Sequence, residues 1–310
     1  MGGAPRSDQR AGRPGLAEAA VRPILQATGW VPHQAQARGG QGTRGGIAVS
    51  SAAPPEALLG DVTRDALAEL LLATADDEFV IGFWDSEWTG IAPMLEEDVA
   101  MSSIAQDEIG HARALYELLA ETTHDDPDRI AFGRPADAFR HAALMNHPRT
   151  DWAFTVARRF LYEHADAVRL EALARSSHER LAGLAGKMRR EESYHRMHAD
   201  AWLQRLAEAG GEARKRLTAA LQRLWPDADA VFTPLSGEPE LLASGVLAEP
   251  LAALHGRWRA RVRPTLERLS LPVGGDGAPP PDGRTRRTDD FRWLHGEFTM
   301  VAGSEEGATW

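Results

Sequence analysis

The 310-residue sequence contains no cysteine. This absence excludes disulfides, zinc fingers, thiolate-ligated iron–sulfur clusters and cysteine nucleophiles, and it fits a reducing compartment, so we expect a cytoplasmic protein. No apolar stretch approaches the roughly 18 residues of a membrane-spanning helix, and no membrane partner is expected. Basic residues are outnumbered, 35 against 45 acidic ones, for a formal net charge of -10. That balance argues against nucleic acid as a partner, because nucleic-acid-binding surfaces are basic.

Acidic residues are scarce only in the first part of the chain. Residues 1–54 hold six arginines against two acidic residues, and 15 of these 54 residues are glycine or proline. We therefore expect residues 1–55 to be a disordered basic tail, or the product of a start site placed too far upstream. The tail contains a formal G-x-G-x-x-G motif from Gly40 to Gly45, but it lies in low-complexity sequence without a strand before it, so we assign it no cofactor.

Between about residues 60 and 210, apolar residues recur every three or four positions, which is the period of amphipathic helices. The breaks in this pattern predict four helices, at about 61–88, 94–121, 151–175 and 179–209. Gly210 and Gly211 are expected to end the last of them. The predicted fold is all-α, with one domain over 56–310. It comprises a four-helix bundle at about 60–210 and a C-terminal helical layer over 212–310.

The C-terminal layer is expected to contain an amphipathic helix within 241–269, a linker over 272–286 and a short final helix over 288–302. Three tryptophans in this part of the chain, Trp225, Trp258 and Trp293, are expected to cover the bundle, since packing is the commoner use of such side chains.

Each of the four predicted apolar stripes carries acidic or histidine side chains where core residues are expected. These residues are Glu78, Glu108, His111, Glu163, Glu192 and His195. Carboxylates buried together repel one another, and each costs several kcal/mol to desolvate, a penalty that a bound cation relieves. In each Glu-x-x-His the two side chains share a helix face about one turn apart, so both can reach one ion.

The positions along the helices provide an independent check. Glu78 and Glu108 are equidistant from Pro93 in the first turn, and Glu163 and Glu192 are equidistant from the second turn at 177–178. Both hairpins therefore deliver their acids to one layer, roughly 22 Å from the turns. The order Glu, Glu-x-x-His, Glu, Glu-x-x-His is the ligand set of ferritin-like di-iron and di-manganese bundles. This donor set suits iron or manganese better than structural zinc.

Several alternatives stay open at this point. The six residues also suit a buried polar network, the relic of a metal site. Asp85 shares a helix face with Glu78 and is either a rival ligand or a group that supports the ligands. A third Glu-x-x-His, from Glu121 to His124, lies at a helix end and is expected to be a chance pair.

Four stretches of the chain resemble a known family. They are 75–119, with the run SEWTGIAPMLEED as its most specific part, 151–177 (DWAFTVARRFLYEHADAVRLEALARSS), 187–206 (KMRREESYHRMHADAWLQRL) and 287–310 (RTDDFRWLHGEFTMVAGSEEGATW). They resemble the phenylacetic acid catabolic protein family, and within it the C-type subunits of bacterial phenylacetyl-CoA 1,2-epoxidases. The resemblance covers roughly residues 56–310.

The resemblance implies a subunit of a multicomponent monooxygenase that uses O2 to epoxidise the aromatic ring of phenylacetyl-CoA. In that family the catalytic di-iron centre lies in an A-type subunit, and the C-type subunit is a structural partner whose metal ligands have decayed. This chain departs from the pattern because it keeps all six candidate ligands. The implied cofactor is di-iron, with manganese as the other option. The implied partners are the A-type subunit, the acyl-CoA substrate and a separate NAD(P)H-dependent reductase, since a chain without cysteine holds no iron–sulfur cluster.

Three functions are therefore carried forward. The first is a metal-binding monooxygenase subunit, the second is a metal-free scaffold that pairs with the A-type subunit, and the third is a stand-alone ferritin-like oxidase or radical-generating protein. The third needs a tyrosine beside the metals, and helix geometry places Tyr116, Tyr162 and Tyr194 away from the ligand stripes. Five arginines flank the ligand helices and are assigned no role: Arg113, Arg158, Arg159, Arg189 and Arg190.

Overall fold

The computed structural model describes residues 60–275 and 277–304, and every regular element in these two stretches is a helix. The expected tail at 1–55 and the glycine motif at 40–45 lie outside the described residues. No described helix combines the length and the apolar character that crossing a membrane would require.

Two helical hairpins form the core, as the sequence predicts. The first consists of α2 (Asp61–Ser86) and α3 (Leu95–Thr123), and the second of α5 (Trp152–Leu173) and α6 (Glu179–Ala209). Each predicted helix end lies within two residues of the observed one. Gly210 follows α6 with a φ of 67°, a left-handed value that glycine adopts without strain. The all-α, ferritin-like bundle is thus confirmed.

The chain between the hairpins is more structured than its sequence suggested. It contains α4 (Pro127–Phe132) and two 3-10 turns, η2 (Ala136–Ala138) and η3 (Ala143–Asn146). The Asp126 side chain accepts a hydrogen bond from the backbone N–H of Arg129 and so caps α4. No hydrophobic period marks these short elements, because each spans about one turn.

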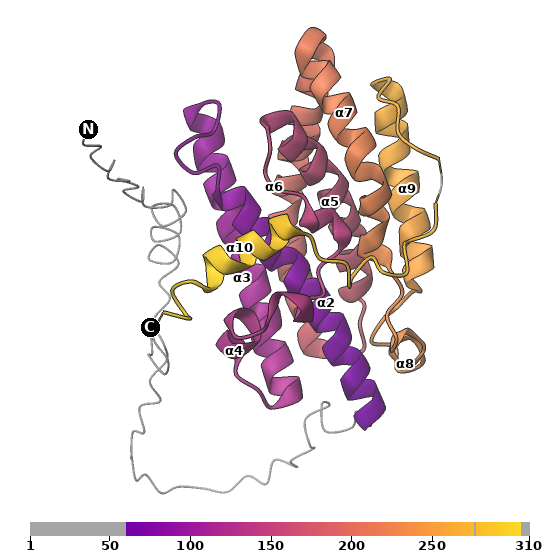
Figure 1. Ribbon diagram of the computed structural model, residues 1–310. Coiled ribbons are helices and arrows are strands. Elements are labelled where there is room, and N and C mark those ends of the chain that lie inside the picture. The colour runs from indigo at the N-terminus through magenta and orange to yellow at the C-terminus, as the bar shows by residue number, and fades with distance from the viewer. Residues whose placement is uncertain (1–59, 276, 305–310) are drawn as a thin grey trace, which may run out of the picture.

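The C-terminal layer covers the second hairpin with its two longest helices and contacts α2 with two shorter ones. It comprises α7 (Gly211–Ala228), η4 (Asp229–Phe232), α8 (Glu238–Ala243), α9 (Leu251–Arg268) and α10 (Asp289–Thr299). In Figure 1, α7 and α9 stand beside α5 on the side away from α2 and α3, and α10 lies across α2. Trp225 and Trp258 are buried as expected. Trp293 is 51% exposed, although its ring stacks on that of Trp84.

The segment predicted as a linker, 272–286, contains no helix in its described part, but it is anchored in the core. Arg284 is buried and donates hydrogen bonds to both carboxylate oxygens of Asp77 on α2, at 3.1 and 3.0 Å. It also donates to the backbone carbonyl of Val231, at 2.8 Å. This arginine therefore ties the C-terminal layer to the first hairpin.

Helix α5 is buried around almost its whole circumference, because the bundle covers one side and α7 and α9 cover the other. Its arginines Arg158, Arg159 and Arg169 are consequently buried with it. A buried guanidinium must be paired with acids to be tolerated. The partners of these arginines lie in or beside the carboxylate layer.

Candidate metal centre

All six residues singled out from the sequence meet in one layer between the two hairpins. Their side chains are buried, with exposed fractions from 0% to 4%. They form two groups in which the potential ligand atoms lie within 4.8 Å of one another: Glu78, Glu108, His111 and Glu192 in the first, and Glu108, Glu163, Glu192 and His195 in the second. We call these the His111 half and the His195 half. Glu108 and Glu192 belong to both.

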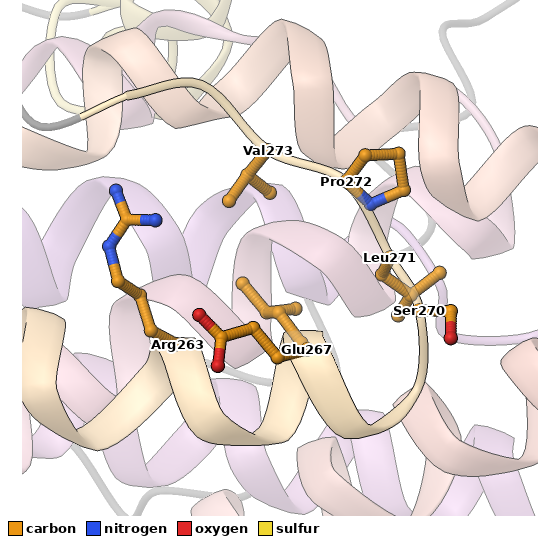
Figure 2. Close-up of a pocket in the computed structure, with 7 residues that line it drawn as sticks. Arg263, Glu267, Ser270, Leu271, Pro272 and Val273 are labelled. Carbon is orange, nitrogen blue, oxygen red and sulfur yellow. The ribbon is translucent and has the colours of Figure 1, made fainter.

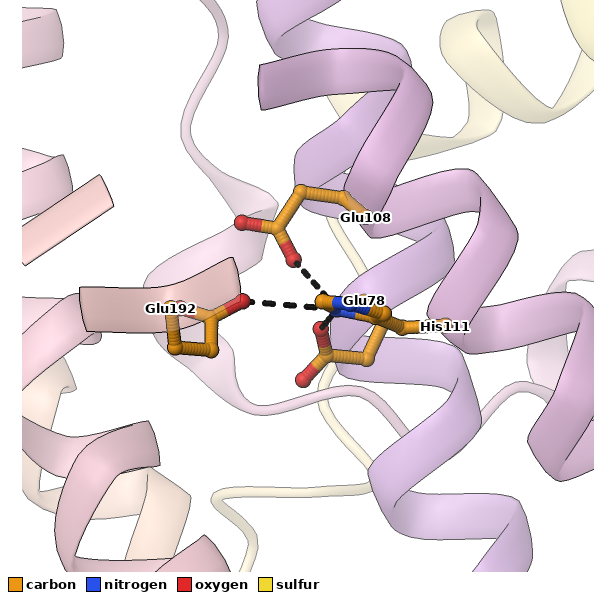
Figure 3. Close-up of side chains that lie close together, drawn as sticks. All are labelled: Glu78, Glu108, His111 and Glu192. Atoms are coloured by element: carbon orange, nitrogen blue, oxygen red, sulfur yellow. Dashed lines mark ion pairs between the residues drawn. The ribbon is translucent and has the colours of Figure 1, made fainter. Parts of the chain in front are cut away.

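Figure 3 shows the His111 half, with three carboxylates directed at one imidazole. The Nδ1 atom of His111 lies 3.3 Å from Glu192 Oε1, 3.5 Å from Glu78 Oε2 and 4.0 Å from Glu108 Oε2. These side chains come from three helices, α2, α3 and α6. They meet at one level of the bundle, where the distances from the two turns predict them to lie.

The His195 half repeats this arrangement. The Nδ1 atom of His195 lies 3.1 Å from Glu192 Oε1 and 3.5 Å from Glu108 Oε1. Oε1 of Glu192 thus faces both histidines, and Glu108 presents a different oxygen to each. Two carboxylates shared between two sets of ligands suit a two-ion centre of the kind found in carboxylate bundles.

The Nε2 atom of each histidine contacts a carboxylate of the other helix, on the side away from the centre. Nε2 of His111 on α3 lies 2.8 Å from Oε2 of Glu191 on α6, and Nε2 of His195 on α6 lies 3.2 Å from Oδ2 of Asp107 on α3. Such a carboxylate accepts a hydrogen bond from Nε2–H, which fixes the tautomer whose unprotonated Nδ1 can face an ion. These two acids were not predicted from the sequence. The available signal was that each directly precedes the glutamate of a Glu-x-x-His.

The atoms that face the centre lack ordinary hydrogen bonds. Among the described residues, these buried side-chain atoms have no hydrogen-bond partner: Glu78 Oε2, Glu108 Oε2, Glu163 Oε2, Glu192 Oε1, His111 Nδ1 and His195 Nδ1. Unpaired buried polar atoms are costly. Because all of them converge on one layer, and because the donor set is carboxylate and imidazole, the residues fit a pair of iron or manganese ions.

The charges of the cluster perturb its titration. Burial opposes a charged imidazole, but contacts with Glu192 and Glu78 outweigh it and raise the pKa of His111 to about 12. Burial and the neighbouring Glu192 raise the pKa of Glu108, yet Arg159 and His195 prevail and lower it to about 2. Burial, followed by the charges of Asp166 and Glu108, raises the pKa of Glu78 well above its usual value. Perturbations of this kind gather at functional sites.

One tyrosine reaches the cluster, contrary to the helical-wheel expectation. The hydroxyl of Tyr162 on α5 donates a hydrogen bond to Glu78 Oε1 at 2.6 Å, and Arg169 Nη2 donates to the same oxygen at 2.8 Å. Tyr162 does point away from the ligand stripe of its own helix, but it points towards the ligand of α2. Of the other tyrosines, Tyr116 binds Asp76 and Tyr194 is half-exposed.

Asp85 belongs to neither half of the cluster. Its Oδ1 accepts a hydrogen bond from Arg158 Nη2 at 3.1 Å, and its Oδ2 accepts one from Arg159 Nη1 at 2.9 Å. Two of the five arginines left without a role are thus buried beside the candidate site. The other three, Arg113, Arg189 and Arg190, are exposed on their helices.

Two further features lie apart from the centre. Glu121 and His124 are both exposed, and Glu121 pairs with Arg180, as a chance motif would. A pocket of about 430 Å³ opens at the end of α9 (Figure 2). It is lined by Arg263, Leu266, Glu267, Ser270, Leu271, Pro272 and Val273, none of which belongs to the cluster.

Comparison with known proteins gives a consistent result. The model of the family described as phenylacetic acid catabolic protein matches residues 49–310. The chain is 28% identical over 238 residues to the C subunit of the 1,2-phenylacetyl-CoA epoxidase of Escherichia coli (strain K12), covering 74% of this chain and 90% of that protein. It is 29% identical over 192 residues to the A subunit of the same organism's enzyme, covering 61% and 60% of the two chains.

Proposed function

The chain belongs to the phenylacetic acid catabolic protein family, and on that premise we propose that it is a subunit of a multicomponent monooxygenase that epoxidises the aromatic ring of phenylacetyl-CoA. We further propose that its own bundle holds a pair of metal ions. The two Escherichia coli relatives are the C and A subunits of such an epoxidase, which supports the substrate and the pairing with an A-type subunit.

The observation that carries the metal-binding part is the convergence of unpaired atoms. Both histidines direct Nδ1 at the centre without a well-aligned hydrogen bond, and Glu192 Oε1 lies within 3.3 Å of each. A structural polar network would pair these atoms with donors and acceptors from the protein. Here the hydrogen bonds are made on the outer side, by Glu191 and Asp107, while the inner atoms have only ion-pair contacts with one another.

The residues of the layer have two roles, metal binding and orientation of the ligands. Six side chains, Glu78, Glu108, His111, Glu163, Glu192 and His195, bind the metal pair. Such a pair supplies activation of dioxygen after two-electron reduction. Asp107 and Glu191 orient the imidazoles.

The overall reaction balances only with a reductase. One oxygen atom of O2 enters the ring and the other leaves as water, so two electrons and two protons are consumed for each epoxide. We propose that a separate NAD(P)H-dependent reductase delivers the electrons, because the chain has no cysteine with which to bind an iron–sulfur cluster of its own.

The decisive experiment measures metal content and turnover together. The purified chain, reconstituted with Fe²⁺ without oxygen, is expected to hold close to two irons, and Glu108→Ala and Glu192→Ala are expected to lose them. Combined with the reductase and the A-type subunit, these variants are expected to lose epoxidation of phenylacetyl-CoA. Glu208→Ala, an exposed glutamate of α6, is the matched control.

The same experiment separates the alternative of a metal-free scaffold. An iron-free native chain, together with full turnover by both variants in the reconstituted complex, would establish the scaffold role. Loss of iron with full turnover would place catalysis solely in the A-type subunit.

The Tyr162–Glu78 hydrogen bond favours one second candidate, a stand-alone oxidase that forms a tyrosyl radical. It predicts a radical signal in electron paramagnetic resonance when the iron-loaded chain meets O2 without any partner. The signal should be absent in Tyr162→Phe. An iron-loaded chain that gives no such signal is not a protein of this class.

A further inference from the structure

A guanidinium lies inside the carboxylate layer. Arg159 is on α5, one turn before Glu163, and its side chain is 3% exposed. Its Nη1 donates hydrogen bonds to Glu108 Oε1 at 2.7 Å and to Asp85 Oδ2 at 2.9 Å, and its Nη2 forms an ion pair with Glu163 Oε1. Arginine keeps its charge under all ordinary conditions. The cluster therefore has a permanent internal cation.

This cation shares an oxygen atom with the His195 half. Glu108 Oε1, which accepts the bond from Arg159, is the oxygen that lies 3.5 Å from His195 Nδ1. The other contact of Arg159, Glu163 Oε1, belongs to the carboxylate found only in that half. An ion bound by His195 and Glu108 would share Glu108 Oε1 with the guanidinium, and Glu163 would have only Oε2 free of Arg159.

In the His111 half, the oxygens that face His111 are not held by a guanidinium. Arg159 contacts the shared Glu108 through Oε1, on the His195 side. Arg169 contacts Glu78 through Oε1, while the inward-facing Oε2 has no hydrogen-bond partner among the described residues. Arg169 is also neutralised by Asp166 and Asp77, which it contacts directly. Glu108 Oε2, the oxygen on the His111 side, likewise has no hydrogen-bond partner in the described part of the chain.

We propose that Arg159 competes with metal for the His195 half. The first ion therefore binds in the His111 half, and the second binds in the His195 half as the guanidinium moves onto Asp85. This inference rests on the proposed metal-binding function. Repulsion between a guanidinium and a divalent cation in a buried layer is strong, because little water screens it. Asp85 already accepts a hydrogen bond from Arg159 and needs no rearrangement to retain it.

Two variants with opposite effects test the proposal, with Mn²⁺ alone as the probe and free Mn²⁺ followed by electron paramagnetic resonance. The wild-type chain should bind two ions in two separate steps. Arg159→Gln should tighten the second step by about tenfold or more, because it removes the competing charge. Asp85→Asn should weaken the second step, because it removes the acceptor onto which Arg159 withdraws. Arg113→Gln, an exposed arginine paired with Glu117, should change neither step.

The order of loading gives a test that does not depend on the folding of the Arg159 variant. His195→Ala should abolish the weaker step and keep the tighter one, whereas His111→Ala should abolish the tighter one. Opposite shifts in Arg159→Gln and Asp85→Asn support a competitive role, since a merely structural role would weaken binding in both.

The failures of the two proposals are distinguishable. If the wild-type chain binds two Mn²⁺ ions with equal affinity, and Arg159→Gln does not change these affinities, the competition is overturned and the metal centre is retained. A wild-type chain and an Arg159→Gln variant that both bind no Mn²⁺ would overturn the metal centre itself. Binding by Arg159→Gln alone would show a site that the arginine closes, which supports the competition.

Discussion

Nε2 of His111 on α3 lies 2.8 Å from Oε2 of Glu191 on α6, so the residue before one candidate ligand holds the imidazole of another. Asp107 and His195 form the reciprocal pair between the same two helices at 3.2 Å. Each Glu-x-x-His therefore depends on the opposite helix for its orientation. The two motifs act as one unit even though 80 residues separate His111 from Glu191.

The first prediction concerns this support. Glu191→Ala should weaken metal binding by about 10- to 100-fold, because the imidazole of His111 loses the acceptor that fixes its orientation. Glu191→Gln, which keeps an acceptor oxygen, should lose less. Titration with Mn²⁺ measures both, and Glu208→Ala is the control. Equal affinity in Glu191→Ala and the wild-type chain would contradict this role.

The second prediction concerns the approach of α2 to α3. A Cβ atom added at Gly82 would lie 2.9 Å from Ile109 Cγ1, 3.1 Å from Glu108 Cβ and 3.2 Å from the Ala105 carbonyl oxygen. Gly82→Ala should therefore push the helix that carries Glu108, lower the free energy of unfolding by about 1–3 kcal/mol and weaken metal binding.

Gly110 provides the matched comparison for Gly82. It is exposed on α3, and an added Cβ would meet nothing within 4 Å. Gly110→Ala should stabilise the chain by about 0.5–1 kcal/mol, since alanine restricts the unfolded chain and favours the helix. Chemical denaturation measures both variants. A neutral effect of Gly82→Ala would show that the helices separate without cost.

The third prediction is a pH dependence of stability. His141 is buried, and desolvation, with the positive charge of Arg287 next in importance, holds its pKa well below the usual 6.5. Below about pH 6.5 His141 is protonated in the unfolded chain but stays neutral in the folded chain. The free energy of unfolding therefore decreases as the pH is lowered. This contribution reaches about 1.4 kcal/mol per pH unit.

His141→Gln should remove that contribution. The variant loses the hydrogen-bonded contact with Asn146 at 3.0 Å, so it should be less stable at pH 7. Its deficit should shrink between pH 6.5 and pH 5, as measured by thermal unfolding. His124→Asn, at an exposed position, should keep the dependence of the wild-type chain. A constant deficit across this range would mean that His141 does not remain neutral in the folded chain.

The fourth prediction concerns removal of metal. Binding to the folded chain alone should stabilise it by about 2.7 kcal/mol at a free concentration of 100 times Kd. For a domain of this size the melting temperature should rise by about 5–10 °C. A chelator should reverse the shift. Glu192→Gln, whose native carboxylate faces both histidines, should show none. A shift retained in Glu192→Gln would place the bound metal elsewhere.

Local sequence was sufficient for the four bundle helices and for the six residues of the layer. The helical period and the turn at Pro93 place Glu78 and Glu108 level with each other, and the same counting applies to Glu163 and Glu192. This succeeds because rise and periodicity are properties of a single helix and a single turn. The family resemblance, carried by contiguous motifs, is confirmed by the match over residues 49–310.

What surrounds the layer was decided by the tertiary structure. In the sequence Arg159 has the position of an exposed helix-face arginine. It is nevertheless buried, because its side chain enters the layer between the hairpins and contacts Asp85 of α2 and Glu108 of α3. Tyr162 reaches Glu78 because the packing of the two hairpins brings a side chain of α5 to one of α2. Such contacts depend on which helices approach and on what covers them. The sequence by itself thus determined which residues form the carboxylate and histidine layer, and only the packing of distant helices decided which charges and hydrogen bonds control it.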